Sequence, residues 1–336
     1  EKILKNNESI FKVIKPKDNT FFSKLNSSDL LDLMILLEEY YLEYRENLDL
    51  KPDVTFGLEL EFEHSNNVMI NTSLKSLGIA NRWAIKPDIT LFNGGEIASP
   101  ILRDKKETWL ELKKVCDVLN KYAKIGENSG GHIHIGSHVL GSKKDSWLNF
   151  IKLWAAYENI IFRFSYGEYL TERPNIMRYA SPFALDFFED YEKVSDEVYN
   201  ATDLIYLTDA SKLRAVSFRK VYNLDKFSKN DTIEFRCPNG TLNPIIWQNN
   251  VNFFAKILKY AKSTSFDQDI VTKRFLKLKD ENLTINLYDE INLDQALELC
   301  DLLFTNNRDK IYFLRQYLKE FKTETMPFVK AKKFTL

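Results

Sequence analysis

Apolar and polar side chains alternate one by one in several short segments of this chain. Residues 56–63 read Phe-Gly-Leu-Glu-Leu-Glu-Phe-Glu. Successive side chains of a strand point to opposite sides of the sheet. The segment therefore predicts a strand with one apolar face, while its other face carries Glu59, Glu61 and Glu63.

Other segments repeat this arrangement with different polar residues. Residues 131–136 (Gly-His-Ile-His-Ile-Gly) and 232–237 (Thr-Ile-Glu-Phe-Arg-Cys) alternate in the same way, and a further strand is predicted around Glu96. The polar residues placed opposite the apolar faces of the first two segments are His132, His134, Thr232, Glu234 and Arg236. If all these strands join one sheet, helices pack on its apolar face. Its other face then gathers glutamates, imidazoles and an arginine.

Between these strands the apolar residues recur at helical spacing. The helices predicted from this spacing lie at 28–48, 106–124, 145–165 and 245–262. We expect Ser27 or Ser28 to cap the first helix. The buried stripe of that helix is predicted to contain Leu30, Leu31, Met34, Leu37 and Tyr41.

The rest of the chain is less regular. Residues 83–102 read as two strands joined by an Asn-Gly-Gly turn, which is a strong hairpin signal. Another strand is predicted at 214–221, and the segment 168–182 is irregular and rich in arginine. Beyond 263 the pattern is charged and mostly helical. Together these elements predict an α+β fold.

Composition narrows the class of protein without naming a function. The chain has 336 residues, 44% of them hydrophobic, which is enough for one large domain or two ordinary ones. Lys+Arg (47) and Asp+Glu (48) give a net charge of −1, which argues against a surface that coats nucleic acid. No apolar run reaches the length of a membrane span. The three cysteines are widely spaced, and neither they nor the first residues suggest secretion, so we expect a cytoplasmic protein.

The acidic face of segment 56–63 can be explained in two ways. Glutamates two positions apart lie roughly 6–7 Å from each other, and at an effective dielectric near 20 each pair repels by about 2–3 kcal/mol. A strand with one solvated acidic side would tolerate that repulsion. A cluster that also contains an imidazole would instead suit Mg²⁺ or Mn²⁺, with positions left for phosphate oxygens. Each motif alone is weak evidence, and their repetition favours a site with several metal ions.

Four motifs in series resemble the amidoligase family, which belongs to the glutamine synthetase and glutamate–cysteine ligase superfamily. They are 56–62, then Trp83 to Pro100 with its Asp88-Ile-Thr and Gly-Glu-Ile-Ala-Ser-Pro, then 130–135, then 232 onward to Asn-Gly-Thr-Leu. The resemblance spans about 56–258. It implies a curved, mainly antiparallel sheet of glutamine synthetase catalytic type, with helices on one face and helical extensions at both ends.

The resemblance also implies roles for individual residues. The implied metal ligands are Glu59, Glu61, Glu96, His132, Glu234 and Asp88. The implied catalytic residues are Arg236, which would stabilise the transferring phosphoryl group, with Glu61 and His134. The implied nucleotide contacts are His134 and Arg236, with Arg173 and Arg178 from an arginine-bearing loop. The chain departs from the family at Ile89, where a small residue is more usual, and this weakens the match at Asp88.

These roles describe an ATP-dependent carboxylate–amine ligase. A carboxylate is a poor acyl donor, so joining it to an amine requires activation, here as an acyl phosphate made with ATP. Mg²⁺ or Mn²⁺ ions and an arginine would stabilise the charge on the phosphoryl group. The expected partners are ATP, an amino-acid or peptide carboxylate and an amine acceptor, and an oligomer is possible. Glu63 could take the amine proton, or it could be a solvated strand end.

The resemblance divides the chain into three regions. Residues 1–50 would form an N-terminal helical extension, 51–262 the catalytic domain, and 263–336 a C-terminal helical region packed on that domain.

Two other functions remain open on the sequence. A cupin-type metal-dependent oxygenase or isomerase could use His132, His134 and His138, although it would leave the glutamate strand unexplained. A non-catalytic module could hold structural Ca²⁺, although Arg236 argues against it. A P-loop at 136–143 is excluded because its lysine is misplaced. The segment reads better as a strand exit with His138 exposed.

Overall fold

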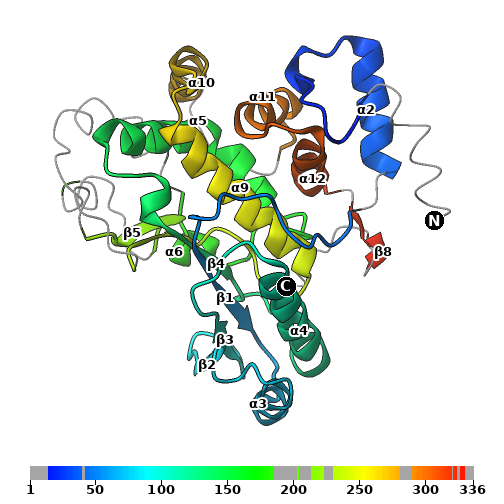
Figure 1. Cartoon of the computed structure of the whole chain (residues 1–336), viewed down its shortest axis with the longest axis vertical. Helices are drawn as coiled ribbons and strands as arrows, with labels where there is room; N and C mark the ends of the chain where they lie inside the picture. Colours follow the sequence, from blue (N-terminus) through cyan, green and yellow to red (C-terminus); the bar gives the residue numbers. More distant parts are fainter. Residues whose placement is uncertain are drawn as a thin grey trace.

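The computed structural model of the chain describes residues 14–39, 42–182, 184, 203, 213–222, 230–280, 290–319, 321–323 and 326–329. Figure 1 shows a central sheet with long helices lying across one side of it. The N-terminal helix and the last helices of the chain lie together at one end of the molecule (Figure 1).

Among the described residues, six strands form one sheet in the order β2-β3-β1-β4-β6-β5. All neighbouring strands are antiparallel, as the family resemblance implies. The strands are β1 (Phe56–Phe62), β2 (Ala84–Pro87), β3 (Gly95–Ala98), β4 (Gly131–Gly136), β5 (Val216–Lys220) and β6 (Thr232–Phe235). The strands with the strictest alternation, β1 and β4, lie side by side at the centre.

The apolar face of the sheet is covered by three helices. They are α4 (Lys106–Tyr122), α5 (Lys144–Ser165) and α9 (Pro244–Lys262). Phe56 of β1 stacks on Trp109 of α4 with ring centroids 5.2 Å apart. Phe235 of β6 stacks on Trp154 of α5 and, at 4.2 Å, on Phe254 of α9. Because these helices cover the apolar face of the sheet, a functional site would lie on its polar face.

The remaining elements surround this unit. They are η1 (Phe22–Lys24), α2 (Ser27–Glu39), α3 (Asn67–Ser76), η2 (Ser137–Val139), α6 (Ile176–Tyr179), α10 (Gln268–Asp280), α11 (Leu293–Leu303), α12 (Asn307–Leu318), β7 (Phe321–Thr323) and β8 (Met326–Val329).

Residues 20–45 contact helices near the C-terminal end of the described chain. The backbone N–H of Phe22 donates to Asp301 (2.9 Å), and that of Thr20 donates to Asn307 (2.8 Å). Arg45 forms an ion pair with Asp309 (2.7 Å). The N-terminal segment is therefore held by α11 and α12, and Figure 1 shows α2 beside these helices.

Three local predictions about the first helix are wrong. It ends at Glu39 rather than at 48, because Leu42 and Leu48 are buried elsewhere and the Leu48 backbone donates to the Asp104 carboxylate. Its cap is Asn26, whose side chain accepts a hydrogen bond from the Asp29 N–H. Leu37 is buried as predicted, and Leu30 and Met34 are partly buried against the core, but Leu31 is 61% exposed. Tyr41 lies outside the described residues.

Two further differences concern turns and strands. The β2–β3 connection is longer than the predicted Asn-Gly-Gly turn, since it runs through residues 88–94. Gly94 is required by a close backbone approach and not by the predicted tight turn, because a Cβ at this position would lie 2.0 Å from the Phe62 carbonyl oxygen. The region beyond 263 is mostly helical, as predicted, but it also contains the unpredicted strands β7 and β8, which pair as an antiparallel ribbon.

Candidate metal and nucleotide site

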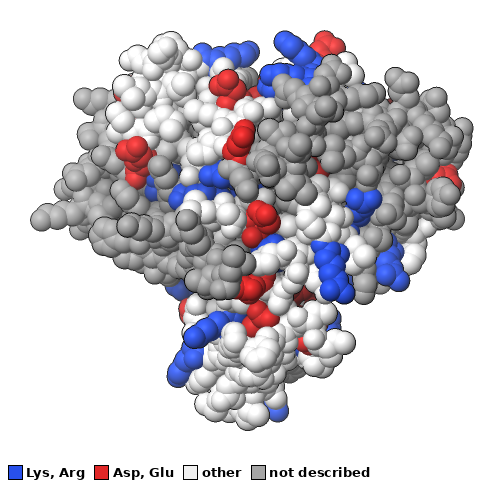
Figure 2. Space-filling view, turned by 180° about the vertical axis from the view of Figure 1, so that it is seen from behind, with Lys and Arg blue, Asp and Glu red and all other residues white. Residues whose placement is uncertain are grey.

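The antiparallel register brings the predicted polar residues together on the polar face of the sheet, opposite the face that α4, α5 and α9 cover. Glu59 of β1 pairs with His132 of β4. On one side Glu61 pairs with Glu96 of β3, and on the other side His134 pairs with Glu234 of β6. The registers thus place these side chains in adjacent rows. Seen from behind, acidic side chains form a row down the middle of the surface, with basic side chains on both sides (Figure 2).

One group of possible ligands consists of Glu59, His132 and Glu234. One atom from each lies within 4.8 Å of the other two. The Nδ1 atom of His132 is 3.3 Å from Glu59 Oε2 and 3.9 Å from Glu234 Oε1. These two carboxylates and one imidazole are mostly buried, so their orientation is fixed by the sheet.

A second group consists of Glu61, Asp88 and Glu96, again with one atom from each within 4.8 Å of the others. Asp88 is brought there from the β2–β3 connection, and one of its oxygens accepts hydrogen bonds from the Thr90 N–H and hydroxyl. Ile89 is fully exposed, so its departure from the family pattern does not disturb this turn. The structure therefore places Asp88 with the other predicted ligands.

His132 lies between the two groups. Its Nδ1 atom faces the first group, while its Nε2 atom is 3.4 Å from Glu61 Oε1 of the second. Glu61 is oriented further by the Gly130 N–H, which donates to Oε2 at 2.5 Å. A Cβ at Gly130 would lie about 3 Å from His132 Nε2 and Glu61 Oε2, so glycine gives the loop room beside these side chains.

The donor set fits divalent cations with a preference for oxygen ligands. Five carboxylates and one imidazole suit Mg²⁺ or Mn²⁺ better than Zn²⁺ or copper. Among the described residues, lysine or arginine pairs with only two of these carboxylates, Lys86 with Glu96 and Arg236 with Glu234. Bound cations would offset the remaining negative charge.

Two of the carboxylates are held in the ionised form that a metal ligand needs. Burial by itself raises the pKa of Glu59, but hydrogen bonds with His132 and His134 outweigh burial and lower that pKa far below its usual range. Burial also raises the pKa of Glu234, and the charge of Arg236, followed by those of His132 and His134, lowers it overall.

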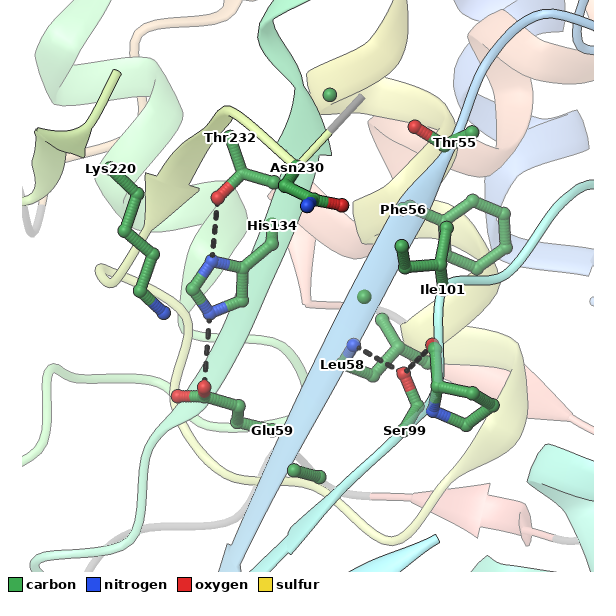
Figure 3. A pocket seen from close by; sticks show the side chains of 14 residues that line it. Thr55, Phe56, Leu58, Glu59, Ser99, Ile101, His134, Lys220, Asn230 and Thr232 are labelled. Carbon is green, nitrogen blue, oxygen red and sulfur yellow. Dashed lines mark hydrogen bonds and ion pairs between the residues drawn. The ribbon is translucent and has the colours of Figure 1, made fainter. Parts of the chain in front are cut away.

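A cavity of about 280 Å³ opens beside the first group. Glu59 and His134 form its wall on the metal side, and Figure 3 shows them with Thr232, whose hydroxyl oxygen lies 3.3 Å from His134 Nδ1. The Nε2 atom of His134 is 3.1 Å from Glu59 Oε1. The other lining residues are Thr55, Phe56, Gly57, Leu58, Ala98, Ser99, Pro100, Ile101, Gly136, Lys220 and Asn230.

Gly57 keeps the floor of this cavity open. It lies on the same face of β1 as Glu59, directly opposite His134. A Cβ at Gly57 would be 3.7 Å from the His134 Cβ and 3.9 Å from the Ser99 hydroxyl, which are ordinary contacts. A larger side chain would fill the space between them. Gly57 is not among the predicted site residues, although its place on the polar face follows from the same alternation.

The three predicted arginines occupy different environments. The Arg236 guanidinium donates to the Glu234 carboxylate and to the Tyr179 carbonyl. Arg173 is 2% exposed, and its Nη1 and Nη2 atoms donate to the carbonyls of Pro238 (2.5 Å) and Arg236 (3.0 Å). Arg178 is exposed over the Tyr179 ring. None of the three arginines is among the residues that line the cavity, so their direct contact with a nucleotide stays a prediction.

Two other residues differ from expectation. Glu63 is not a solvated strand end, because it is 3% exposed and accepts a hydrogen bond from the Phe92 N–H (2.7 Å). His138 is half-buried rather than exposed, and its Nε2 atom donates to the Asp53 carbonyl (2.8 Å). Among the described residues, the groups of possible metal ligands contain His132 but neither His134 nor His138. The three-histidine site of the cupin alternative is therefore not favoured.

The sheet is antiparallel and has helices on one face. Its other face carries one group of two carboxylates and a histidine and one group of three carboxylates, beside a cavity, and this arrangement defines a candidate metal-dependent enzyme. The chain matches the family described as "Putative amidoligase enzyme" over residues 11–258, and it belongs to that family. The family implies a ligase whose substrates carry a carboxylate and an amine. None of the curated proteins searched matches the chain. Within its described part, no helix is both long and apolar enough to cross a membrane.

Proposed function

We propose that the protein is an ATP-dependent carboxylate–amine ligase that acts through an acyl phosphate. The observation that carries this proposal is that the two groups of possible metal ligands and the cavity adjoin one another. The Glu59–His132–Glu234 group contacts the Glu61–Asp88–Glu96 group through His132, and its Glu59 lines the cavity beside His134.

The two groups would hold Mg²⁺ or Mn²⁺. Glu59, His132 and Glu234 would bind the ion nearer the cavity, and Glu61, Asp88 and Glu96 would bind the other. Bound there, the ions would neutralise charge on ATP and on the phosphoryl group in transit. The residues fit this role because their carboxylates are clustered and largely shielded from solvent, with the pKa of Glu59 and that of Glu234 lowered.

The cavity is the proposed nucleotide pocket. Its volume is near the lower end of the range for ligand sites. Its apolar side at Pro100 and Ile101 suits a flat base, while its other end reaches Glu59 and His134. The phosphates would therefore lie toward the metal-binding groups.

Arg236 would stabilise the transferring phosphoryl group. It extends from β6 two residues beyond Glu234, and the Tyr179 carbonyl helps to orient its guanidinium. Positioned hydrogen-bond donors of this kind stabilise the negative charge that develops in the transition state. Arg173 would act indirectly, because it holds the carbonyl oxygen of Arg236 rather than facing the cavity.

The carboxylate and amine would approach from the Glu61–Asp88–Glu96 group, since the nucleotide would occupy the opposite side. An amino-acid or peptide substrate remains the proposal that the family membership supports. Attack of the amine on the acyl phosphate would form a tetrahedral oxyanion, which would lie among the same positive charges. Its collapse would break the bond to phosphate and give the amide, with the amine proton leaving on the released phosphate.

The proposal is tested by binding before any substrate is known. Mg-ATP should raise the melting temperature of the wild-type protein, and Glu59→Gln and Glu234→Gln should abolish that shift. Glu38→Gln, an exposed glutamate of α2, is the matched control and should keep it. A wild-type protein that folds but shows no Mg-ATP shift would refute the proposal.

Catalysis is tested with hydroxylamine as the amine. Pools of amino acids and short peptides would be incubated with Mg-ATP and hydroxylamine, and both hydroxamate and ADP would be measured. The expected result is equal amounts of the two products with at least one carboxylate. Release of ADP without hydroxamate for every pool would contradict the acyl-phosphate mechanism.

A further inference from the structure

Strand β5 contains an irregularity in its pairing with β6. Ser217 pairs with Glu234, and Lys220 pairs with Thr232. Three steps along β5 (217 to 220) therefore correspond to two steps along β6 (234 to 232), which is the mark of a one-residue β-bulge. A bulge leaves one extra residue on its strand and changes the direction of the side chains that follow.

The bulge decides which basic residue faces the site. Regular alternation from Ser217 would put Arg219 on the polar face and Lys220 on the apolar face. With one extra residue, Lys220 is instead opposite Thr232, on the face that carries Glu234. Lys220 accordingly lines the cavity and Arg219 does not. In Figure 3 the side chain of Lys220 extends beside His134 toward Glu59.

Lys220 of β5 places a second basic residue near the acidic group that contains Glu234 of β6. Thr232, Glu234 and Arg236 are successive residues on one face of this chain segment, roughly 6–7 Å apart. Arg236 therefore lies on one side of the Glu59–His132–Glu234 group, and Lys220, paired with Thr232, lies on the other. Among the described residues that line the cavity, Lys220 is the only lysine or arginine.

We infer that Lys220 is a phosphate-binding residue that holds the polyphosphate of the nucleotide at the cavity side of the metal-binding groups. This inference rests on the proposed function and adds to it a residue outside the predicted site. A lysine ammonium is a compact charge on a flexible stem, which suits contact with phosphate oxygens. Lys220 is exposed, so it can move to the ligand without disturbing the core.

The experiment compares nucleotides that differ only in phosphates. Calorimetry would measure the affinity of adenosine, AMP, Mg-ADP and Mg-ATP for the wild type, Lys220→Met, Lys220→Arg and Arg219→Met. Losing one charge-assisted hydrogen bond should weaken Mg-ADP and Mg-ATP binding about tenfold in Lys220→Met. Adenosine affinity and Mn²⁺ affinity without nucleotide should stay unchanged. Lys220→Arg should restore most of the loss, and Arg219→Met should match the wild type.

Other outcomes would overturn the role of Lys220. Unchanged Mg-ATP affinity in Lys220→Met, or the larger loss in Arg219→Met, would overturn the role of Lys220 while leaving the proposed function intact. An equal loss for adenosine would show that Lys220 only shapes the cavity. Failure of the wild type to bind any Mg-nucleotide would refute the proposed function and Lys220 with it. If Lys220→Met does not fold, Lys220→Gln replaces it under the same criteria.

Discussion

The ammonium of Lys86 lies 2.9 Å from a carboxylate oxygen of Glu96, directly across the pairing of β2 and β3. Lys86 is thus a cation held against a predicted metal ligand. The hydrogen bond to Glu96 raises the pKa of Lys86, so the ammonium stays charged at neutral pH. A metal ion at the Glu61–Asp88–Glu96 group must compete with this ion pair.

The first prediction is that Lys86→Met tightens binding of the second divalent ion. An exposed ion pair contributes up to about 1 kcal/mol, so we expect a gain of about twofold to fivefold in Mn²⁺ affinity. Mn²⁺ titration followed by electron paramagnetic resonance measures it. Lys106→Met, which removes an exposed pair with Glu46, is the control and should change nothing. Weaker Mn²⁺ binding in Lys86→Met would contradict the idea of competition.

The second prediction concerns the floor of the cavity. Gly57→Ala should leave Mg-ATP affinity within about threefold of the wild type, because its Cβ would make only ordinary contacts. Gly57→Leu should reduce that affinity at least about tenfold, because the larger side chain would occupy ligand volume. Calorimetry gives both affinities, and circular dichroism confirms folding. Equal binding by the folded Leu variant would place the nucleotide elsewhere.

The third prediction separates the buried from the exposed arginine. Arg173→Gln should lower the free energy of unfolding by about 2–4 kcal/mol, since the buried carbonyls of Pro238 and Arg236 lose charged donors. Arg178→Gln should change it by less than about 0.5 kcal/mol, because that side chain is exposed. Urea unfolding measures both values. A similar small effect for the two variants would mean that Arg173 does not secure the Arg236 backbone.

The fourth prediction follows from the lowered pKa of Glu59. In the unfolded chain this carboxylate takes up a proton near pH 4.3, whereas in the folded protein it does so only at lower pH. The stabilisation is therefore complete above about pH 4.3 and is lost as the pH falls toward the folded pKa. Glu59→Gln should flatten the decline in stability below about pH 4.3, as measured by urea unfolding in EDTA. Parallel curves for the two proteins across that range would contradict the hydrogen bonds with His132 and His134.

The strands of the site could be predicted because alternation is a property of the local backbone. Phe56 to Phe62 and Gly131 to Gly136 form strands with the predicted bounds to within one residue. Helix ends were less predictable. The prediction that α2 continues to residue 48 was wrong. Leu42 and Leu48 are buried, but their spacing in the sequence does not show whether a helix or an irregular segment brings them into the core.

Candidate residues were also not equally predictable. Glu59, Glu61, His132 and Glu234 follow from alternation and from the resemblance to the amidoligase family, and the structure brings them together. Arg173 and Arg178 share one sequence segment, yet one is buried and the other exposed. Nothing in the local pattern distinguishes their environments. Gly57 and Lys220 become noticeable only when the cavity is known.

For the regularly alternating strands β1, β4 and β6, the amino-acid sequence is enough to assign the face that carries the charged residues, because side-chain direction along a strand without a bulge depends only on residue parity. The division of those residues into two groups with His132 between them depends on tertiary contacts, since strand register fixes which side chains meet. Tertiary contacts also explain why Lys220, rather than Arg219, faces the cavity. A one-residue bulge reverses parity, and such a bulge is set by pairing with the neighbouring strand.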